Sequence, residues 1–540
     1  MKIRYQKLIA AITAASVLGL TVSTATGVSQ ANCFVTEEKT PVNTERGGTI
    51  WSRSFSDGRG TTYNSQPIVT EDTIYIVSKN ILYALDSAGN IIRQKTLSAS
   101  MNSVCFMELY EGKLFIPLSG GCMECVDAET FEHVWLSESF GGQSLSYVTC
   151  HEGFVYAGTT EMKMGNTTEG TFYCLDTRDG SVQWSYHNFE NTGGYYWSGS
   201  CVMNDRLYFA GDNGRLVEHD LTQDVIYSET VLSGEGQIRS NLVYEEDQQA
   251  LYTVSNVGEF IAYAGEKVSS WKLFPQAKAV NCTSTPTIVD GTAYVGAMAD
   301  GMGYLCVWDI AAHSMRYTVE TGKGCEVKST PLVSTAYGDA KYIYYSHNNI
   351  PGGVYYIIDS KGSVSSVQYT LYEPAVAKQY CISSIVPGAG GVLYYSNDTG
   401  TLFAVSEVER SSDYVEPTPP SAGSAVQDKT PSPGTSSGGG KENSATSKKV
   451  KKPKKPSKVR IKKTKKGFKI RWKKGSGSAK TFVYGKVGKG KWKKLTSTKK
   501  TSYIWKNPKK KKTYIRLRSG IKFKNKWYYS EYTKKYKIKS

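Results

Sequence analysis

The sequence predicts an all-β protein, in which an eight-bladed β-propeller is followed by a disordered linker and a small β-sandwich; a seven-bladed propeller is the alternative. Three observations predict this organisation. A unit of short apolar and aromatic runs recurs eight times between residues 45 and 408. No amphipathic helical pattern of any length interrupts these runs. At about residue 409 the composition changes to Pro, Ser, Gly and Lys, and a second, strongly basic region follows.

Residues 1–31 have the pattern of a secretory signal peptide. Three basic residues within the first seven precede an apolar run from Leu8 to about Val22. Small residues then stand at the positions required for cleavage after Ala31. The apolar run is too short to span a membrane. We therefore predict a secreted protein.

An aromatic residue identifies the second strand of each predicted repeat unit. It falls at Tyr75, Phe115, Tyr156, Tyr208, Tyr252, Tyr294, Tyr344 and Tyr394. The gaps between these positions are 40 to 52 residues, the length of one four-stranded propeller blade. Within each unit the runs are short and rich in Val, Ile, Tyr and Phe, as strands are.

The two ends of the repeat region complement each other. The last unit stops after its third strand, at residues 402–405, and an unassigned strand with a tryptophan, residues 49–55, opens the region. Pairing between them would complete the last blade and remove two exposed sheet edges. We therefore expect these two segments to pair and to close the propeller.

The repeat resembles that of the pyrroloquinoline-quinone (PQQ)-like propellers. The segments Tyr83–Asp86 and Tyr173–Asp176 are close to its Leu-Tyr-Ala-Leu-Asp pattern, and the similarity extends over residues 49–408. In that family a tryptophan beyond the Asp turn packs one blade on the next. The resemblance implies this structural blade-docking role for four residues: Trp51, Trp135, Trp184 and Trp271.

The same family contains the quinoprotein dehydrogenases. Their cofactor lies in the central channel beneath a ring formed by two adjacent cysteines, beside a Ca²⁺ ion. This chain has no two adjacent cysteines, and its repeats lack the long insertions that build the enzymes' pocket. Most Asp residues of the repeat stand in turns, where they cap their own backbone. We therefore expect no catalytic residue, no metal site and no cofactor; a PQQ-dependent oxidoreductase is the alternative function.

The 11 cysteines and 6 histidines leave other interpretations open. Cys122 and Cys125 have the CxxC spacing of a metal or redox site, but no second pair completes a zinc site, and Cys125 takes a small strand position of the repeat. The cysteines are either small core residues or include one or two disulfides, whose pairing cannot be read from the sequence. No histidine belongs to a recognisable nucleophile motif.

Tyr195, Tyr196 and Trp197 form an aromatic cluster in a long connection between the third and fourth units. Clustered aromatic residues in a loop suit stacking on sugar rings or contact with a protein partner. We therefore interpret the three as candidate ligand-binding residues. The alternative is that Trp197 begins a strand and packs in the core.

Charge divides the chain into two opposite parts. Residues 448–540 contain 38 Lys and Arg against one acidic residue, Glu531, which gives +37, whereas residues 32–447 carry 25 basic and 47 acidic residues, or −22. Between the ordered regions, residues 409–456 have a Pro-, Ser-, Gly- and Lys-rich composition that cannot bury a core. This composition predicts a disordered linker.

Residues 457–540 alternate apolar with basic residues in several runs, as half-buried strands do. About seven strands in a domain of this size fit a small sandwich. The positions of Trp472, Tyr514 and residues 526–532 resemble those of a fibronectin type III domain. The resemblance implies that Trp472 lies in the core.

The lysines of this domain predict attachment to a polyanion, because like charges on outward faces repel one another until a partner neutralises them. The candidate polyanion-binding residues are Lys462, Lys463, Lys465, Lys466, Lys473, Lys474, Lys509, Lys510, Lys511 and Lys512. For an exported protein we expect an anionic cell-envelope polymer, such as a teichoic acid, on a Gram-positive-type surface; nucleic acid would bind by the same phosphate attraction. The alternative is a role in solubility or in docking on the acidic propeller. The sequence thus predicts a non-catalytic surface protein whose propeller presents a protein- or glycan-binding face.

Overall fold

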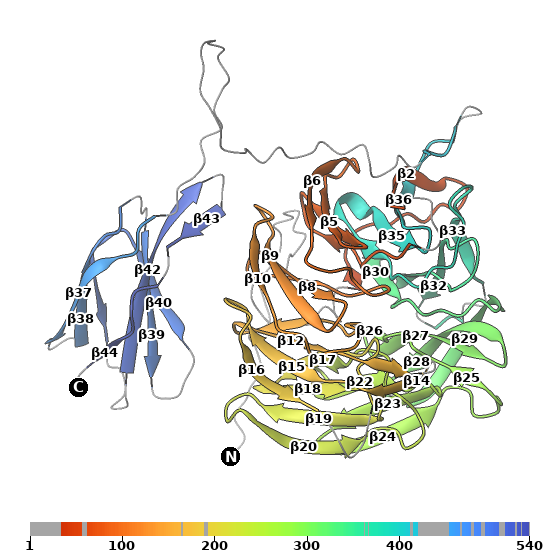
Figure 1. Ribbon diagram of the computed structural model, residues 1–540, viewed down its shortest axis with the longest axis horizontal. Helices are drawn as coiled ribbons and strands as arrows, with labels where there is room; N and C mark the ends of the chain where they lie inside the picture. The colour runs from red at the N-terminus through yellow and green to blue at the C-terminus, as the bar shows by residue number, and fades with distance from the viewer. Residues whose placement is uncertain are drawn as a thin grey trace, which may run out of the picture. The chain divides into compact units, whose positions relative to one another are not determined.

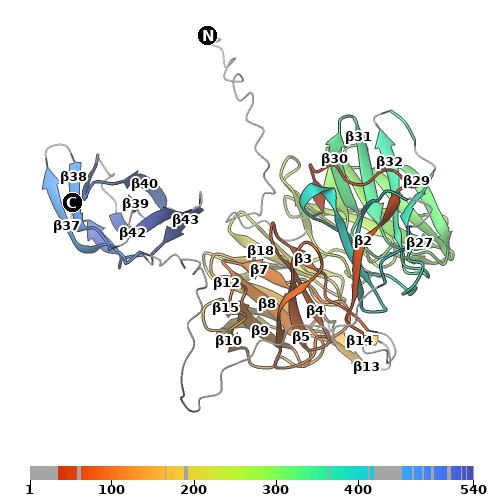
Figure 2. The same ribbon diagram turned by 90° about the horizontal axis from the view of Figure 1, so that it is seen from above.

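The computed structural model describes residues 34–538 except 57–61, 164–165, 188–192, 361, 365–366, 411–413, 419–452, 465–466, 477–479, 488–491, 507–512, 524–525 and 531. The predicted signal peptide and most of the predicted linker therefore lie outside the described residues. The chain divides into a first unit that ends at Thr430 and a second unit that begins at Pro431 (Figures 1 and 2). Apart from the 3₁₀ turn η2 (Ala389–Gly391), the elements of the described residues are strands. None of these residues forms a helix long and apolar enough to cross a membrane.

The described strands of the first unit form eight sheets of four or five strands and one two-stranded hairpin. Sheet 1 contains β3 (Ile68–Val69), β4 (Ile74–Ser78), β5 (Ile81–Leu85) and β6 (Ile91–Thr96), and sheet 2 contains β7 (Glu108–Tyr110), β8 (Lys113–Leu118), β9 (Cys122–Asp127) and β10 (His133–Leu136). Sheet 3 contains β11 (Thr149–His151), β12 (Phe154–Gly158), β15 (Phe172–Asp176) and β16 (Val182–Tyr186), and the hairpin β13 (Glu161–Lys163) and β14 (Asn166–Glu169) is inserted between β12 and β15. Sheet 4 contains β17 (Ser200–Met203), β18 (Arg206–Ala210), β19 (Arg215–Asp220) and β20 (Val225–Val231).

The other four sheets repeat this antiparallel order. Sheet 5 contains β21 (Val243–Glu245), β22 (Ala250–Val254), β23 (Glu259–Ala264) and β24 (Lys267–Lys272), and sheet 6 contains β25 (Val280–Asn281), β26 (Thr287–Val289), β27 (Thr292–Ala299), β28 (Met302–Asp309) and β29 (Ser314–Lys323). Sheet 7 contains β30 (Leu332–Tyr337), β31 (Ala340–Tyr345), β32 (Val354–Ser360) and β33 (Tyr369–Tyr372), with β1 (Val35–Thr36) parallel to β30. Sheet 8 contains β34 (Val386–Pro387), β35 (Leu393–Asn397), β36 (Thr401–Glu407) and β2 (Gly47–Ser54). The all-β, four-stranded repeat predicted from the sequence is confirmed.

The aromatic residue predicted for each second strand lies there in every sheet. All eight of these rings are buried, none more than 9% exposed. Several hydroxyl groups reach beyond their own sheet: that of Tyr75 donates to the carbonyl oxygen of Ala128 (3.1 Å), and that of Tyr294 to Asp359 (2.6 Å). A tyrosine at this position therefore fills the space between sheets and also satisfies its polar end.

The first and last strands of the repeat region pair as predicted. In sheet 8, β2 lies antiparallel to β36, with Trp51 opposite Ala404 and Ser52 opposite Phe403. Hydrogen bonds between the segments that lead into the sheets join neighbouring sheets, for example Gln66 N–H to Cys105 O, Tyr147 N–H to Ser198 O, Ser284 Oγ to Ser329 O, and Gln66 Nε2 to Ser384 O. The last of these bonds joins sheet 1 to sheet 8, so contacts run from the end of the repeat region back to its beginning.

The second unit contains two sheets around one core. One sheet contains β37 (Ser457–Thr464), β38 (Gly467–Lys473) and β41 (Ser502–Trp505), and the other contains β39 (Lys480–Val487), β40 (Lys493–Thr498), β42 (Thr513–Phe523), β43 (Lys526–Tyr529) and β44 (Tyr536–Ile538). Ile470 and Trp472 of the first sheet pack with Val483, Ile515 and Leu517 of the second in one buried cluster. Five runs identified in the sequence are strands here, whereas β40, which is rich in Lys and Thr, was not predicted.

Candidate polyanion-binding site

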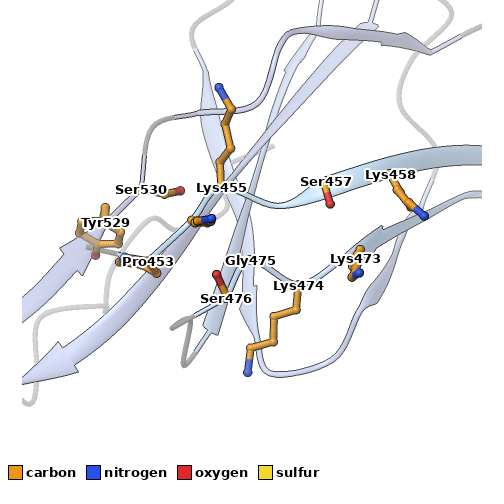
Figure 3. Close-up of a pocket in the computed structure, with 11 residues that line it drawn as sticks. Pro453, Lys455, Ser457, Lys458, Lys473, Lys474, Gly475, Ser476, Tyr529 and Ser530 are labelled. Carbon is orange, nitrogen blue, oxygen red and sulfur yellow. The ribbon is translucent and has the colours of Figure 1, made fainter. Parts of the chain in front are cut away.

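A surface cavity of about 750 Å³ lies in the second unit, where the chain enters it. Four segments line it: Pro453–Lys455, the start of β37, the end of β38 with the turn after it, and the end of β43. Its basic residues are Lys454, Lys455, Lys458, Lys473 and Lys474, and Tyr529 and Ser530 close one end (Figure 3). The lining therefore combines five ammonium groups with serine hydroxyls and one tyrosine.

Local backbone contacts hold the entering segment against the domain. The backbone N–H of Lys454 donates to the carbonyl oxygen of Ser476 (2.9 Å). The glycine beside that turn is required, because a Cβ at Gly475 would overlap the carbonyl oxygen of Lys454. Pro453 and Pro456 are buried on either side of the lysine pair. As a result, Lys454 and Lys455 take fixed positions on the rim of the cavity.

The charge of the lining is of one sign. No Asp or Glu stands among the described residues of the lining, and the whole of residues 448–540 contains a single acidic residue. Lysine ammonium groups act as point-charge donors to phosphate and other oxyanions. The arrangement therefore provides several donors for one multivalent anion or for neighbouring charges of a polymer.

The structure brings together some of the predicted polyanion-binding lysines. Lys473 and Lys474 line the cavity, whereas Lys462 and Lys463 are exposed on β37 and do not belong to the lining. Lys465, Lys466, Lys509, Lys510, Lys511 and Lys512 lie outside the described residues. Lys454 and Lys455 were expected in the linker over residues 409–456, yet they lie on the cavity. The Pro-Lys-Lys-Pro sequence and the later glycine are the signal that could have placed them there.

The aromatic cluster of the first unit divides into two parts. Tyr195 is only 5% exposed and packs edge-on against Phe172 and Phe209, so it belongs to the core between sheets 3 and 4. Tyr196 and Trp197 are half-buried and contact each other. Of the three candidates, only these two are placed where a ligand could reach them.

Two cations lie against the half-buried pair. The Arg239 guanidinium is 4.6 Å from the ring centre of Tyr196 and forms an ion pair with Asp212, and the Lys328 ammonium is 5.7 Å from the ring centre of Trp197. Lys328 also pairs with Glu326 (3.4 Å). Burial raises the pKa of Glu326, an effect that Lys328 opposes. Arg239 and Lys328 are thus neutralised by Asp212 and Glu326. Tyr196 and Trp197 therefore pack against paired charges and do not line an empty pocket.

The four predicted blade-docking tryptophans each contact the following sheet. The indole N–H of Trp51 donates to Ser87 O (2.8 Å) and that of Trp135 to Thr177 O (3.2 Å). Each ring covers a glycine of positive φ, Gly89 or Gly180, at which a Cβ would lie within 2.5 Å of the ring. The other two stack on imidazoles: Trp184 on His219 at 4.4 Å and Trp271 on His313 at 4.5 Å. These partners were missed in the sequence, because each belongs to the next repeat.

The ten described cysteines are free thiols, and eight of them are buried. Burial raises the pKa of the thiols of Cys105, Cys125, Cys201 and Cys381 to about 12. They are therefore protonated at neutral pH and poor nucleophiles. Within the described part of the chain, no three His, Cys, Asp or Glu side chains gather as a metal-ligand set.

Side chains of segments that lead into different sheets meet in the first unit. The Tyr147 hydroxyl lies 3.4 Å from Thr330 Oγ1, just before β30 of sheet 7, and Phe106 stacks on Tyr147 at 3.6 Å. The cavity bounded by Phe106, Tyr147, Trp197 and Lys328 measures about 20 Å³, room for one water molecule. This cavity is too small for a three-ring cofactor such as PQQ.

A repeat of four-stranded sheets joined by tryptophans defines a propeller protein of the PQQ-like class. A family model described as outer membrane protein assembly factor BamB matches residues 42–186 and 107–311, which together span half of the chain. The chain therefore belongs to this family. No curated protein matches the sequence significantly.

Solved structures of two kinds resemble the model. BamB from Moraxella catarrhalis is 15% identical, with a TM-score of 0.50, over 67% of this chain and 99% of that one. A quinohemoprotein alcohol dehydrogenase from Pseudomonas putida HK5 is 12% identical, with a TM-score of 0.52, over 76% of this chain and 81% of that one. The corresponding enzyme from Comamonas testosteroni is 12% identical, with a TM-score of 0.51, over 69% and 79%. At these identities the likeness concerns the fold, and it includes both an assembly factor and enzymes.

Proposed function

We propose that this protein is a secreted, non-catalytic binding protein of a cell surface. Its second unit attaches to an anionic polymer of the envelope, of the teichoic acid type, and its propeller presents a face to a protein or a glycan. The observation that carries the proposal is the group of five lysines around one cavity in a domain with almost no acidic residues. The localisation rests on the signal-peptide pattern of residues 1–31.

A polyanion would relieve the repulsion that this domain builds into itself. Ammonium groups gathered on one rim repel one another, and a ligand with several negative charges converts that cost into attraction. Ser457, Ser476 and Ser530 add hydroxyl groups to the lining, which suit the remaining oxygen atoms of a phosphate or a polyol. Such binding would weaken steeply as salt concentration rises.

For the first unit, we propose that the eight sheets are the eight blades of one propeller closed by β2. The contact between Tyr147 and Thr330 and the small cavity beside them support a scaffold rather than a dehydrogenase. The assembly factor among the similar structures is a precedent for such a role. Tyr196 and Trp197, braced by Arg239 and Lys328, are the candidate contact residues of the presented face. For the second unit, we propose a sandwich of the fibronectin type III type.

The first test compares two matched pairs of substitutions in the full chain. Lys473→Gln with Lys474→Gln removes two charges from the cavity, and Lys499→Gln with Lys500→Gln removes two exposed charges that do not line it. Titration calorimetry with tripolyphosphate and with purified poly(glycerol phosphate) measures Kd at several salt concentrations. We expect the cavity pair to raise Kd about tenfold and the control pair less than twofold.

Equal weakening by both pairs would contradict a defined site and would favour diffuse charge attraction. The non-catalytic part has its own test, a thermal unfolding scan with PQQ and Ca²⁺. A ligand at a hundred times its Kd stabilises a fold by about 2.7 kcal/mol. A shift of that size in the propeller transition would contradict the proposal and reinstate the oxidoreductase.

A further inference from the structure

Arginine and aromatic side chains alternate on one face of the second unit. Along β42, Ile515 and Leu517 are fully buried in the core, so Arg516 and Arg518 belong to the opposite face. The Arg516 guanidinium lies 4.6 Å from the ring centre of Trp492 and 3.9 Å from that of Tyr532. The two arginines and their rings therefore form a stacked ladder.

The second arginine extends this ladder. The Arg518 guanidinium lies 3.8 Å from the ring centre of Tyr529, 4.9 Å from that of Tyr532 and 5.4 Å from that of Tyr484. Its Nη2 also donates to the Tyr484 hydroxyl (3.0 Å). Tyr532 thus contacts both guanidinium groups, and the ladder runs in the order Trp492, Arg516, Tyr532, Arg518, Tyr529.

Part of the hydrogen-bonding capacity of the ladder has no partner among the described residues. Arg516 has no hydrogen-bond acceptor among the described residues, and the Nε atoms of both arginines are buried without one. The single acidic residue of residues 448–540, Glu531, lies outside the described residues. A guanidinium carries five N–H donors in one plane; stacking covers its faces and burial shields its Nε–H here, which leaves the terminal Nη–H donors for an oxyanion.

The ladder is continuous with the lysine cavity. Tyr529 lines that cavity beside Ser530 (Figure 3), and its ring also contacts the Arg518 guanidinium. A ligand that fills the cavity at its tyrosine end therefore meets Arg518 next. The cavity and the ladder therefore form one continuous surface, with lysines at one end and stacked arginines at the other.

We propose that the cavity and the ladder form a single track for an extended chain of phosphate groups, long enough to contact both, rather than a site for one small anion. This inference rests on the proposed attachment of the second unit to an anionic polymer, and it specifies the chemistry and the length of that polymer. Phosphate is the oxyanion that lysine point charges and planar arginine forks both bind well.

The faces of the tyrosine rings in the ladder are already covered, which argues against a nucleic acid that binds by stacking its bases. Base stacking needs an aromatic face that is open to the ligand. Here Tyr532 contacts Arg516 and Arg518, and Tyr529 contacts Arg518 and Phe482. The ladder therefore offers guanidinium edges to phosphate groups, and we expect no preference for a strand that carries bases.

The experiment measures binding of the full chain to inorganic polyphosphate of graded length, from tripolyphosphate upwards. The variant Arg516→Gln with Arg518→Gln removes the ladder's charge, and Lys499→Gln with Lys500→Gln is the charge-matched control. In the unmodified protein we expect affinity to rise with chain length until the track is filled. The ladder variant should lose on the order of tenfold in affinity for long chains, and less than twofold for tripolyphosphate.

Three outcomes would overturn the track. Affinity that is independent of length, equal weakening for short and long chains, or tighter binding of single-stranded DNA than of polyphosphate with the same number of phosphates would each do so. Should the Gln variant unfold, Arg516→Lys with Arg518→Lys keeps the charge but loses the planar fork, and it should still reduce the long-chain gain. If the unmodified protein binds neither tripolyphosphate nor longer polyphosphate, the proposed function itself is rejected.

Discussion

Both units bury aromatic side chains in their cores, but the second unit also carries a row of rings outside its core. In the first unit, tryptophans pack on glycine turns or imidazoles of the next sheet, and tyrosines fill the space between sheets, so that nearly every ring has a structural partner. In the second unit, three rings of one face stack on guanidinium groups and contribute nothing to the buried cluster. The difference indicates that the second unit is the place to look for binding, because its row of rings and arginines lies outside the buried core.

The largest expected effect is a break in the docking of the first unit. Trp135 is 6% exposed, donates to Thr177 O and covers Gly180. Trp135→Ala removes these contacts and leaves a cavity between sheets, which should cost about 3–5 kcal/mol of unfolding free energy. Urea unfolding of the full chain, followed by circular dichroism, measures this loss in the propeller transition.

Trp472→Ala is the matched variant in the second unit, where Trp472 is 4% exposed and donates to Thr481 Oγ1 (3.0 Å). This variant should lower the urea concentration at the midpoint of unfolding of the second unit and leave the midpoint of the propeller unchanged. A common shift of both transitions with either variant would contradict the division into two independent units.

Much of the first unit could be predicted from the sequence because its repeat follows from a packing requirement that is the same in every sheet. An aromatic ring of the second strand must fill the same gap in every sheet, so Tyr75, Tyr294 and their equivalents recur every 40 to 52 residues. Closure by β2 and β36 also followed, since one strand was missing at one end and unassigned at the other. The partners Gly180 and His219 could not be found in this way, because docking joins different repeats.

The site in the second unit was only partly visible in the sequence. A lysine load predicts a polyanion but not which lysines converge, because nearly every run of the domain is basic. Lys473 and Lys454 are brought together by a backbone hydrogen bond and by a glycine that allows close approach, and neither follows from composition. The alternation of Arg516 and Arg518 was readable as a strand, whereas their ring partners come from other strands and loops.

A smaller effect concerns pH, and it belongs to the first unit. His347 is 4% exposed, stacks on Tyr355 at 3.9 Å, and has no hydrogen-bond partner for either ring nitrogen among the described residues. Burial lowers its pKa from 6.5 to about 4. Between pH 6.5 and 4 the unfolded chain therefore binds more protons than the folded chain. Because of this histidine, the free energy of unfolding should fall by about 3 kcal/mol as pH falls from 6.5 to 4.

Asp398 acts in the opposite direction over nearly the same interval. Burial raises its pKa from 3.8 to about 6, so the folded state binds more protons and gains stability as pH falls through 6. The residue is half-buried, and water reduces this gain. Measured against the unmodified protein, His347→Phe should make the propeller relatively more stable at pH 4 than at pH 7, and Asp398→Asn relatively less stable. Parallel pH profiles in all three proteins would contradict both assignments.

The smallest expected effect is that of salt, and it separates the units by charge. The second unit carries its lysines with almost no acidic neighbours, so screening should reduce its self-repulsion, whereas the first unit has ion pairs such as Arg316–Asp359 and Lys341–Asp290 that screening weakens. Raising NaCl from low to physiological concentration should therefore stabilise the second unit by about 0.5 kcal/mol and leave the first unchanged or slightly less stable. Calorimetric scans that resolve the two transitions measure these shifts. Salt and polyphosphate should then stabilise the second unit non-additively, because screening by salt removes the same repulsion that the polymer neutralises; additive shifts would show that the polymer binds elsewhere.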